Sequence, residues 1–240
     1  MHETMNRYRT ALQRLTLELG REPTVEELSA NIGCDTERIR SLSQLISDTV
    51  SLDAPVGEDG ETHHGLFDVA MLTTVPGVTV YSPSDTAELS QCLEQALYKD
   101  KGVVAVRYPR GCELYRSGTK AYSDFRHVSN KSRKLIFTYG RISAYAYTVH
   151  GVDVLQAIKI FPIADEIIDI CLAYDEIYAF EEGEREGGIA QKLCTALALA
   201  GFKGRFTITA VDGFVRHADV ATQLHNAMLD ADGMRKITGE

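Results

Sequence analysis

The first fifty residues place apolar side chains at the spacing of short helices. Apolar residues recur every three or four positions up to Leu19, and Gly20 is suited to end a helix in the left-handed conformation. A second helix is predicted after Thr24, whose side chain can cap it while Glu27 completes a capping box, and Gly33 ends it. The pattern therefore predicts short helices separated by glycine-containing turns.

A third helix is predicted to begin at Asp35, which can cap it, with apolar positions that include Ile39 and Leu42. Two short helices around a glycine turn are typical of a helix-turn-helix, and the alternative is a three-helix packing unit without DNA contact. Residues 1–57 hold six arginines, no lysine and nine acidic residues, a net charge of −3. Strong phosphate binding needs an excess of cations, so composition favours the packing unit.

Farther along the chain, short apolar runs alternate with amphipathic helices. Residues 78–83 (VTVYSP) and 102–111 (GVVAVRYPRG) predict strands. Between them, residues 84–100 predict a helix capped by Ser84 or Asp85. Its apolar positions at helical spacing are Leu89, Cys92, Leu93, Ala96 and Leu97. Strand, helix and strand in this order predict a right-handed βαβ unit.

Residues 112–132 are polar and aperiodic, and they predict an interdomain linker. Strands and helices alternate again from there to the C-terminus. The predicted strands lie at 134–140, within 153–163, at 176–183 and at 205–211, and the predicted helices at 165–174 and 187–201. The whole chain is thus predicted as a small all-α module followed by α/β layers with mostly parallel sheets.

Composition is that of an ordinary globular protein of 240 residues, 44% of them hydrophobic. The net charge of −9 argues against a surface that binds polyanions over the whole molecule. Five cysteines lie far apart without CxxC spacing, which is typical of reduced thiols and predicts no metal site. No apolar run is long enough to span a bilayer and no signal peptide begins the chain, so we expect a cytoplasmic protein without membrane contact.

Candidate chemistry gathers around the predicted βαβ unit. His63 and His64 form a pair in a polar, glycine-flanked loop, and a solvated surface loop is the alternative interpretation. Arg107 and Arg110 follow the second strand at its carboxyl end, where open α/β sheets usually bind ligands, although ion pairs with Asp or Glu would explain them equally. The glycine-rich EGEREGGI at 182–189 lacks dinucleotide or Walker spacing and favours a tight loop before a helix.

The string HETMNRYRTALQRLTLELGREPTVEELSANIG, followed by VSLDAPVGEDG, resembles region 3 of housekeeping bacterial sigma factors over about the first 60 residues. That family reads promoter DNA here through a histidine and a glutamate. Glu3 matches the glutamate, whereas the histidine would precede Met1. The resemblance implies RNA polymerase or weak promoter DNA as a partner of residues 1–57.

From residue 56 onward the chain resembles 1-deoxy-D-xylulose-5-phosphate synthase, a transketolase-superfamily enzyme. THHGLFD at 62–68 and RYPRG at 107–111 carry the resemblance. It implies that His63 and Asp59 are catalytic-site residues and that Arg110 binds the phosphate of glyceraldehyde 3-phosphate. An imidazole exchanges protons near neutral pH, and a guanidinium grips phosphate oxygens. The family also implies a homodimer and a sugar-phosphate substrate.

The later strings FTYGR, EEGEREGGIA, DGFVRHA and LDADGM resemble the transketolase C-terminal domain, which implies a structural role for His217. RISAYAYTVHG at 141–151 is shorter than the family's first crossover helix, and a crossover normally needs about a dozen residues. The family uses thiamine diphosphate and magnesium. Their main motifs, the activating glutamate and the aromatic platform have no counterpart in this sequence.

These resemblances predict a chimera joined in the shared string VGEDG at 56–60. Its expected parts are a sigma-like module at 1–57, a partial pyrimidine-binding domain at 58–111, a linker at 112–132 and a C-terminal domain at 133–240. The expected function is that of the carboxyl-terminal portion of the synthase, with little activity alone. The alternatives are a sigma-derived transcription module and one half of a split synthase.

Overall fold

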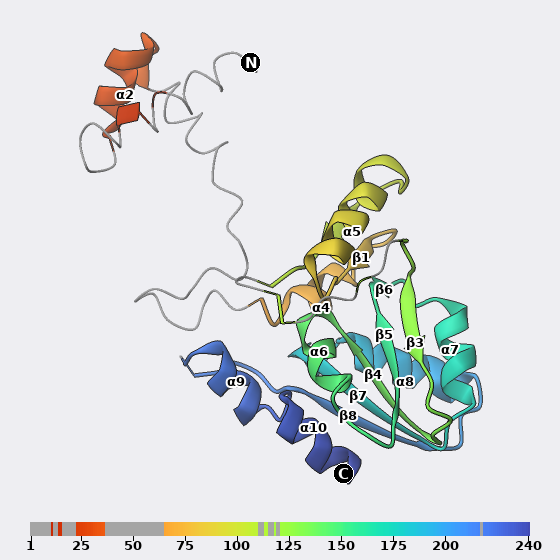
Figure 1. Ribbon diagram of the computed structural model, residues 1–240. Helices are drawn as coiled ribbons and strands as arrows, with labels where there is room; N and C mark the ends of the chain where they lie inside the picture. Colours follow the sequence, from red (N-terminus) through yellow and green to blue (C-terminus); the bar gives the residue numbers. More distant parts are fainter. Residues whose placement is uncertain are drawn as a thin grey trace. The chain divides into compact units, whose positions relative to one another are not determined.

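The computed structural model describes residues 11, 14–15, 23–36, 65–109, 113–114, 118, 121–216 and 218–240. The chain divides into two compact units, Met1–Ser51 and Leu52–Glu240. Figure 1 draws the described residues as ribbon.

In the first unit, α2 (Val25–Ile32) forms as its sequence predicts. The Glu27 backbone N–H donates to Thr24 Oγ1 at 3.3 Å, and the Thr24 N–H donates to the Glu27 carboxylate at 2.8 Å, which completes the capping box. Gly33 ends the helix with a φ of 72°, a backbone conformation that favours glycine. Leu28 lies in a small apolar core with Ala11. The predicted third helix from Asp35 falls almost entirely outside the described residues.

The second unit is α/β and carries two sheets. Its strands are β1 (Thr79–Tyr81), β2 (Val104–Val106), β3 (Phe125–Val128), β4 (Lys134–Tyr139), β5 (Asp153–Ala157), β6 (Lys159–Phe161), β7 (Glu176–Glu184) and β8 (Arg205–Val211). Its helices are α4 (Asp68–Leu72), α5 (Thr86–Tyr98), α6 (Ser143–Ala146) after the 3-10 turn η2 (Gly140–Ile142), α7 (Asp165–Leu172), α8 (Ile189–Leu199), α9 (Val220–Asn226) and α10 (Ala231–Thr238). The predicted α/β class with mostly parallel sheets is confirmed by this arrangement, while the prediction of three helices in the preceding module falls largely outside the described residues.

The small sheet has the strand order β2-β1-β6. β1 and β2 pair in parallel and α5 connects them, which confirms the predicted strand-helix-strand unit. Asp85, one of two expected caps, accepts from the backbone N–H of Glu88 at 2.8 Å and begins α5. The third strand, β6, comes from far along the chain and pairs antiparallel with β1. The small sheet therefore depends on the C-terminal part of the sequence.

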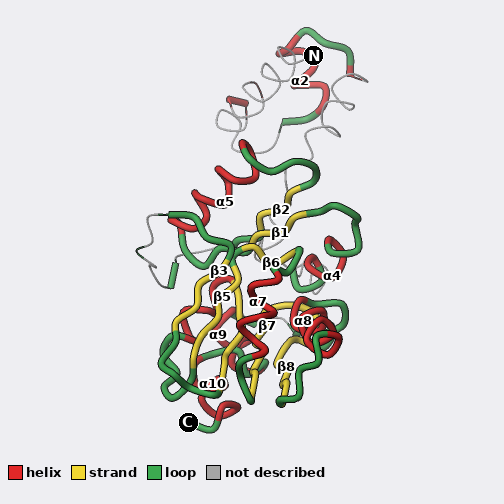
Figure 2. The backbone as a smooth tube through the Cα atoms, turned by 90° about the vertical axis from the view of Figure 1, so that its right-hand side faces the viewer, coloured by secondary structure: helices red, strands yellow, loops and turns green. Residues whose placement is uncertain are grey.

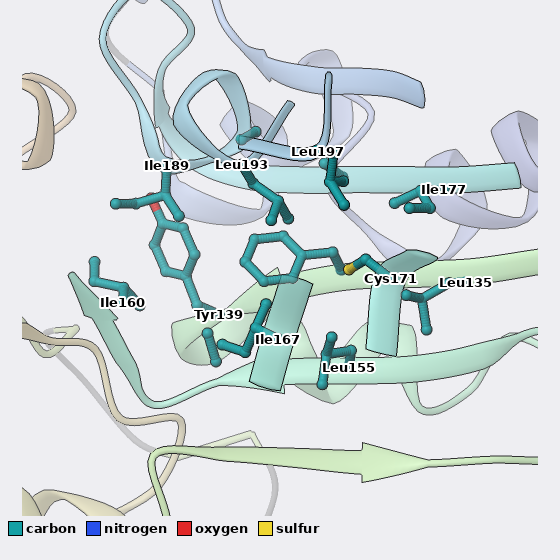
Figure 3. Close-up of a cluster of buried hydrophobic side chains, with 14 of the residues drawn as sticks. Leu135, Tyr139, Leu155, Ile160, Ile167, Cys171, Ile177, Ile189, Leu193 and Leu197 are labelled. Carbon is teal, nitrogen blue, oxygen red and sulfur yellow. The ribbon is translucent and has the colours of Figure 1, made fainter. Parts of the chain in front are cut away.

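The large sheet has the order β3-β5-β4-β7-β8, with only β3 antiparallel. α7 and α8 supply apolar side chains to the core on one face, where Leu135 and Leu155 meet Ile167, Cys171 and Leu193 (Figure 3). On the other face, Ile136, Val154 and Tyr178 pack with residues of α6, α9 and α10. Figure 2 shows the strands of this sheet side by side between the helices. Both faces of the central strands are covered, as parallel sheets require.

In the large sheet, strand β3 differs from the sequence prediction, and the short helix α6 agrees with it. β3 lies at Phe125–Val128, inside the range expected as linker, because its backbone pairs with the free edge of β5 from Phe125↔Ala157 to Val128↔Val154. This pairing uses backbone groups, so a polar sequence gave little signal of it. α6 is only Ser143–Ala146, which agrees with the shortened crossover expected at 141–151.

Candidate functional site

The residues expected to carry the chemistry, His63, Asp59, Arg110 and Glu3, lie outside the described residues, as does His217. The structure describes segments close to His63 and Arg110. Gly65 follows His63 by two positions, and Pro109 immediately precedes Arg110. The described neighbourhood therefore defines the edge of the molecule from which the expected site would be built.

Arg107 contacts several of the segments that meet here. It follows the carboxyl end of β2, and its Nε–H lies 3.2 Å and 3.0 Å from the two carboxylate oxygens of Asp68 at the start of α4. Its Nη2 donates to the carbonyl oxygens of Gly65 at 3.2 Å and Glu182 at 2.9 Å. The side chains of Arg107 and Asp68 are only 15% and 6% exposed. The ion-pair interpretation of Arg107, left open by the sequence, is thus confirmed.

The chain just after the histidine pair is also held by β7. The backbone N–H of Glu184 donates to the carbonyl of Leu66 at 2.8 Å. A Cβ at Gly183 would lie 3.5 Å from that same carbonyl, so the two backbones pass at van der Waals distance. Arg141, at the carboxyl end of β4, forms an ion pair with the Glu182 side chain. The segment from residue 65 is therefore fixed to the large sheet by main-chain and side-chain contacts.

A buried carboxylate occupies the N-terminus of α8. Glu181 accepts from the backbone N–H groups of Ile189 at 2.9 Å and Ala190 at 2.8 Å, and the Tyr139 hydroxyl donates to it at 2.5 Å. Burial raises the pKa of Glu181, although these hydrogen bonds and the nearby charge of Arg107 oppose the shift. A Cβ at Gly188 would lie 2.6 Å from the Glu181 carboxylate. EGEREGGI is thus a tight loop before a helix, with the helix N-terminus occupied by a side chain of the protein itself.

A second buried polar cluster joins the small sheet to the large one. Glu88 of α5 accepts from the N–H and hydroxyl of Ser84 at 2.7 Å and 2.8 Å, and its Oε1 lies 2.6 Å from Arg126 Nη2 of β3. The Gln156 amide of β5 donates to Glu88 Oε2 at 3.0 Å. Sequence analysis missed this cluster because Glu88, Arg126 and Gln156 look like ordinary surface polar residues; Glu88 at the third position of a capped helix was the single available signal.

Among residues 65–109 and the described part of 113–240, no group of three His, Cys, Asp or Glu side chains has metal-binding geometry.

A groove of about 630 Å³ lies between β8 and the helices α9 and α10, away from Arg107, and Arg185, Asp212 and Met228 are among its lining residues. No described helix is both long and apolar enough to cross a membrane.

Comparisons with known proteins show which family and which proteins this chain is similar to. Residues 34–113 match the family described as the transketolase pyrimidine-binding domain. The 1-deoxy-D-xylulose-5-phosphate synthase of Chlorobium phaeovibrioides is 32% identical over 217 residues, which cover 80% of this chain and 34% of that protein. The synthase of Gloeobacter violaceus is 30% identical over 235 residues, covering 84% of this chain and 36% of that protein. The chain thus spans about a third of the length of these curated relatives.

Two solved structures share the fold. One is a split-gene transketolase described as an inactive β4 tetramer, with a TM-score of 0.63 and 18% identity over 72% of this chain and 61% of that one. The other is a transketolase variant from Pichia stipitis in complex with fructose 6-phosphate, with a TM-score of 0.60 and 14% identity, covering 90% of this chain and 33% of that one. At these identities they show the fold alone.

Residues 34–113 thus match the transketolase pyrimidine-binding domain, most of the chain is similar to 1-deoxy-D-xylulose-5-phosphate synthases, and the α/β fold is transketolase-like. The family match begins at Cys34, inside the range that resembles a sigma factor, and these comparisons give no support to a sigma fusion.

Proposed function

We propose that this chain is the carboxyl-terminal portion of a 1-deoxy-D-xylulose-5-phosphate synthase, an enzyme that condenses pyruvate with glyceraldehyde 3-phosphate, and that it is inactive alone. One structural observation carries the proposal. Arg107 of the RYPRG string binds Asp68 of the THHGLFD string, so two motifs that lie 39 residues apart meet at one sheet edge. Relatives of the synthase class at 30–32% identity over most of the chain support the same assignment.

Within this proposal, each site residue has a role that its chemistry permits. His63 exchanges protons with substrate oxygens, because an imidazole titrates near neutral pH. Asp59 lines the same pocket as a hydrogen-bond acceptor. Arg110 holds the acceptor phosphate through its planar guanidinium, which matches phosphate oxygens in a fork. The three residues are proposals from the motif positions they occupy in this sequence.

The transketolase family depends on thiamine diphosphate, which supplies an electron sink for the condensation when bound. The described residues do not fit a site for its diphosphate and magnesium, since they contain no cluster of metal-ligating side chains. The N-terminus of α8 could receive a diphosphate, but Glu181 already occupies it, and that carboxylate would repel a second anion. The proposal therefore places no part of the diphosphate and magnesium site in the described residues of this chain.

A second candidate is that the chain is one half of a split synthase and works when another chain completes it. A solved relative by fold carries the description of a split-gene transketolase and is inactive as a β4 tetramer. Around the small sheet, Leu97 is 69% exposed, Tyr98 80% and Val103 58%. These three side chains lie at the end of α5 and in the loop after it, and exposed large apolar side chains are a feature of protein–protein contacts. We propose that the missing part of the pyrimidine-binding domain covers them.

The test is a product assay with pyruvate, glyceraldehyde 3-phosphate, thiamine diphosphate and magnesium. The chain alone is expected to give no turnover, and turnover by the chain alone would overturn the proposal. A separately expressed cofactor-binding portion of a synthase is then added. Turnover that His63→Ala abolishes and Arg110→Ala weakens through the acceptor KM would favour the split enzyme; Arg133→Ala, an exposed ion-pair residue, is the matched control. Measurement of molecular size on the same samples tests the homodimer that the family resemblance implies.

The sigma resemblance of residues 1–57, including Glu3, is a separate proposal for binding to RNA polymerase or promoter DNA. It rests on the quoted strings alone. The net charge of −3 leaves few cations for counterion release, so any DNA binding is expected to disappear at about 150 mM salt. Titration of an extended promoter duplex at that salt checks this. Sequence-specific submicromolar binding would favour a transcription module over the synthase fragment.

A further inference from the structure

We propose that Arg107 is a positioning residue, which fixes the two chain segments that carry the proposed site onto the end of β7. This inference rests on the proposed function for its catalytic consequence. Its structural part, a three-way contact made by one guanidinium, stands on geometry alone.

The contact set of Arg107 spans three elements that are distant in sequence. The guanidinium binds the Asp68 carboxylate at the start of α4, the Gly65 carbonyl in the preceding loop and the Glu182 carbonyl in β7. Only an arginine offers several N–H donors in a rigid plane that can serve a carboxylate and two carbonyls together. A lysine ammonium in the same place is a single point charge, and we expect it to retain only one or two of these contacts.

The contacts of Arg107 are largely shielded from water, so losing them is expected to weaken the attachment of the contacted segments. The Asp68 side chain is 6% exposed and that of Arg107 is 15% exposed, so water replaces lost hydrogen bonds poorly. Glu181, also buried, lies within electrostatic range of Arg107. Removing the Arg107 charge would leave these acidic groups without compensation on one side of the cluster.

Arg107 is connected to both proposed functional positions by very short lengths of chain. Gly65 follows His63 by two residues, a span of at most about 7 Å for an extended chain. Arg110 follows Arg107 by three residues, a span of at most about 11 Å. Loss of the contacts to Gly65 and Glu182 would therefore free the histidine segment, the arginine segment or both to move relative to the large sheet.

The first experiment measures hydrogen–deuterium exchange in the free full-length chain, wild type against Arg107→Gln and Arg107→Lys. We expect at least tenfold faster exchange in peptides covering 65–70 and 104–109, while peptides from β4 and β5 are unchanged. Arg133→Gln, which removes an exposed ion pair with Asp175 at the opposite end of the strands, is the matched control and should change neither region. Equal exchange at 65–70 in wild type and Arg107→Gln would overturn the inference.

Asp68→Asn is a second variant that keeps the fold testable if Arg107→Gln fails to fold. It removes the charge pair but leaves the two carbonyl contacts available to Arg107, so we expect a smaller increase in exchange at 65–70. No increase in either Asp68→Asn or Arg107→Lys would overturn the positioning role.

The second experiment uses the complemented enzyme described above. Arg107→Lys is expected to lower kcat about a hundredfold, the scale of a misplaced catalytic group, with a smaller change in the cofactor concentration needed for half-maximal rate. If Arg107 has a purely structural role, Arg107→Lys lowers the amount of folded enzyme but leaves kcat per folded molecule unchanged, as well as the KM values for pyruvate and glyceraldehyde 3-phosphate. That result would overturn the inference. If the wild-type mixture itself shows no turnover, the split-enzyme candidate fails while the exchange experiment still decides the role of Arg107.

Discussion

The small sheet and the large sheet of the second unit differ in how completely this chain covers them. Each strand of the small sheet has three residues, and β2 has none that is fully buried. In the large sheet all five residues of β5 are buried, and five of six in β4. The large sheet has helices on both faces, whereas β2 is a sheet edge with exposed apolar neighbours.

The difference extends to α5 and α8, two helices of similar amphipathic pattern. In α8, Leu193 and Leu197 are completely buried against the large sheet. In α5, Cys92 is buried, but Leu93 is 41% exposed and Leu97 is 69% exposed. The spacing of apolar residues identifies a helix in both cases, but it does not say whether the surface that should cover them belongs to the same chain.

The largest expected effect follows from the dependence of the small sheet on β6. A fragment of residues 52–120 lacks β6 and Ile158, which packs with Tyr81 and Cys92. It is also near the size below which a single core is marginal. We expect it to lack a cooperative unfolding transition, whereas residues 121–240 keep one. Circular dichroism during urea titration of both fragments checks this, and a cooperative transition in 52–120 would show that the two sheets fold independently.

The second prediction compares leucines on the two helices. Leu193→Ala is expected to lower the free energy of unfolding by about 2–5 kcal/mol, because it creates a cavity in the core. Leu97→Ala on α5 is expected to change it by less than about 0.5 kcal/mol, because the side chain is mostly exposed. Urea unfolding of the full-length chain measures both. Equal losses would mean that the surface of α5 is covered in solution.

The third prediction concerns pH and the loop that joins β3 to β4. Burial alone would raise the pKa of Asp153, but hydrogen bonds from Tyr174, Ser129 and the backbone N–H groups of Asn130 and Ser132 lower it below its ordinary value of 3.8. The lowered pKa contributes stability that is present above pH 3.8 and is lost as the pH falls through the folded-state pKa.

Asp153→Asn tests this assignment. We expect it to cost about 1–3 kcal/mol of unfolding free energy at pH 7, since a buried acceptor of several hydrogen bonds is weakened. The difference between wild type and variant should shrink as the pH falls below 3.8. Chemical unfolding at pH 7, 5 and 3 measures it, and a difference that stays constant across this range would contradict the assignment.

The smallest expected effect on stability is that of Leu97→Lys. The change should leave the urea midpoint almost unaltered, because position 97 is exposed, yet it should lower the binding of an apolar fluorescent dye and weaken association with the complementing portion of the synthase. Lys99→Glu, at the C-cap of the same helix and also exposed, controls for a general effect of charge. Undiminished association with Leu97→Lys would place the partner contact elsewhere on the chain.

Local signals in the sequence determined much of this protein. The capping box at Thr24 and Glu27, the strands at β1, β4 and β8 and the helix α7 follow from propensity, caps and periodicity, which act over a few residues. The motifs at 62–68 and 107–111 also drew attention to two segments that are in contact in the structure, through Arg107 and Asp68. These features could be predicted because their causes lie within one helical turn or one strand.

Only the tertiary structure decided how distant residues are used. In the fold, Arg107 contacts Asp68 and Glu182, β6 pairs with β1, and a polar stretch forms β3. It also filled the N-terminus of α8 with Glu181 and left Leu97 of α5 exposed. Hydrogen bonds and burial between residues far apart depend on which surfaces meet, and a periodic pattern records that a residue is apolar or charged without recording its partner.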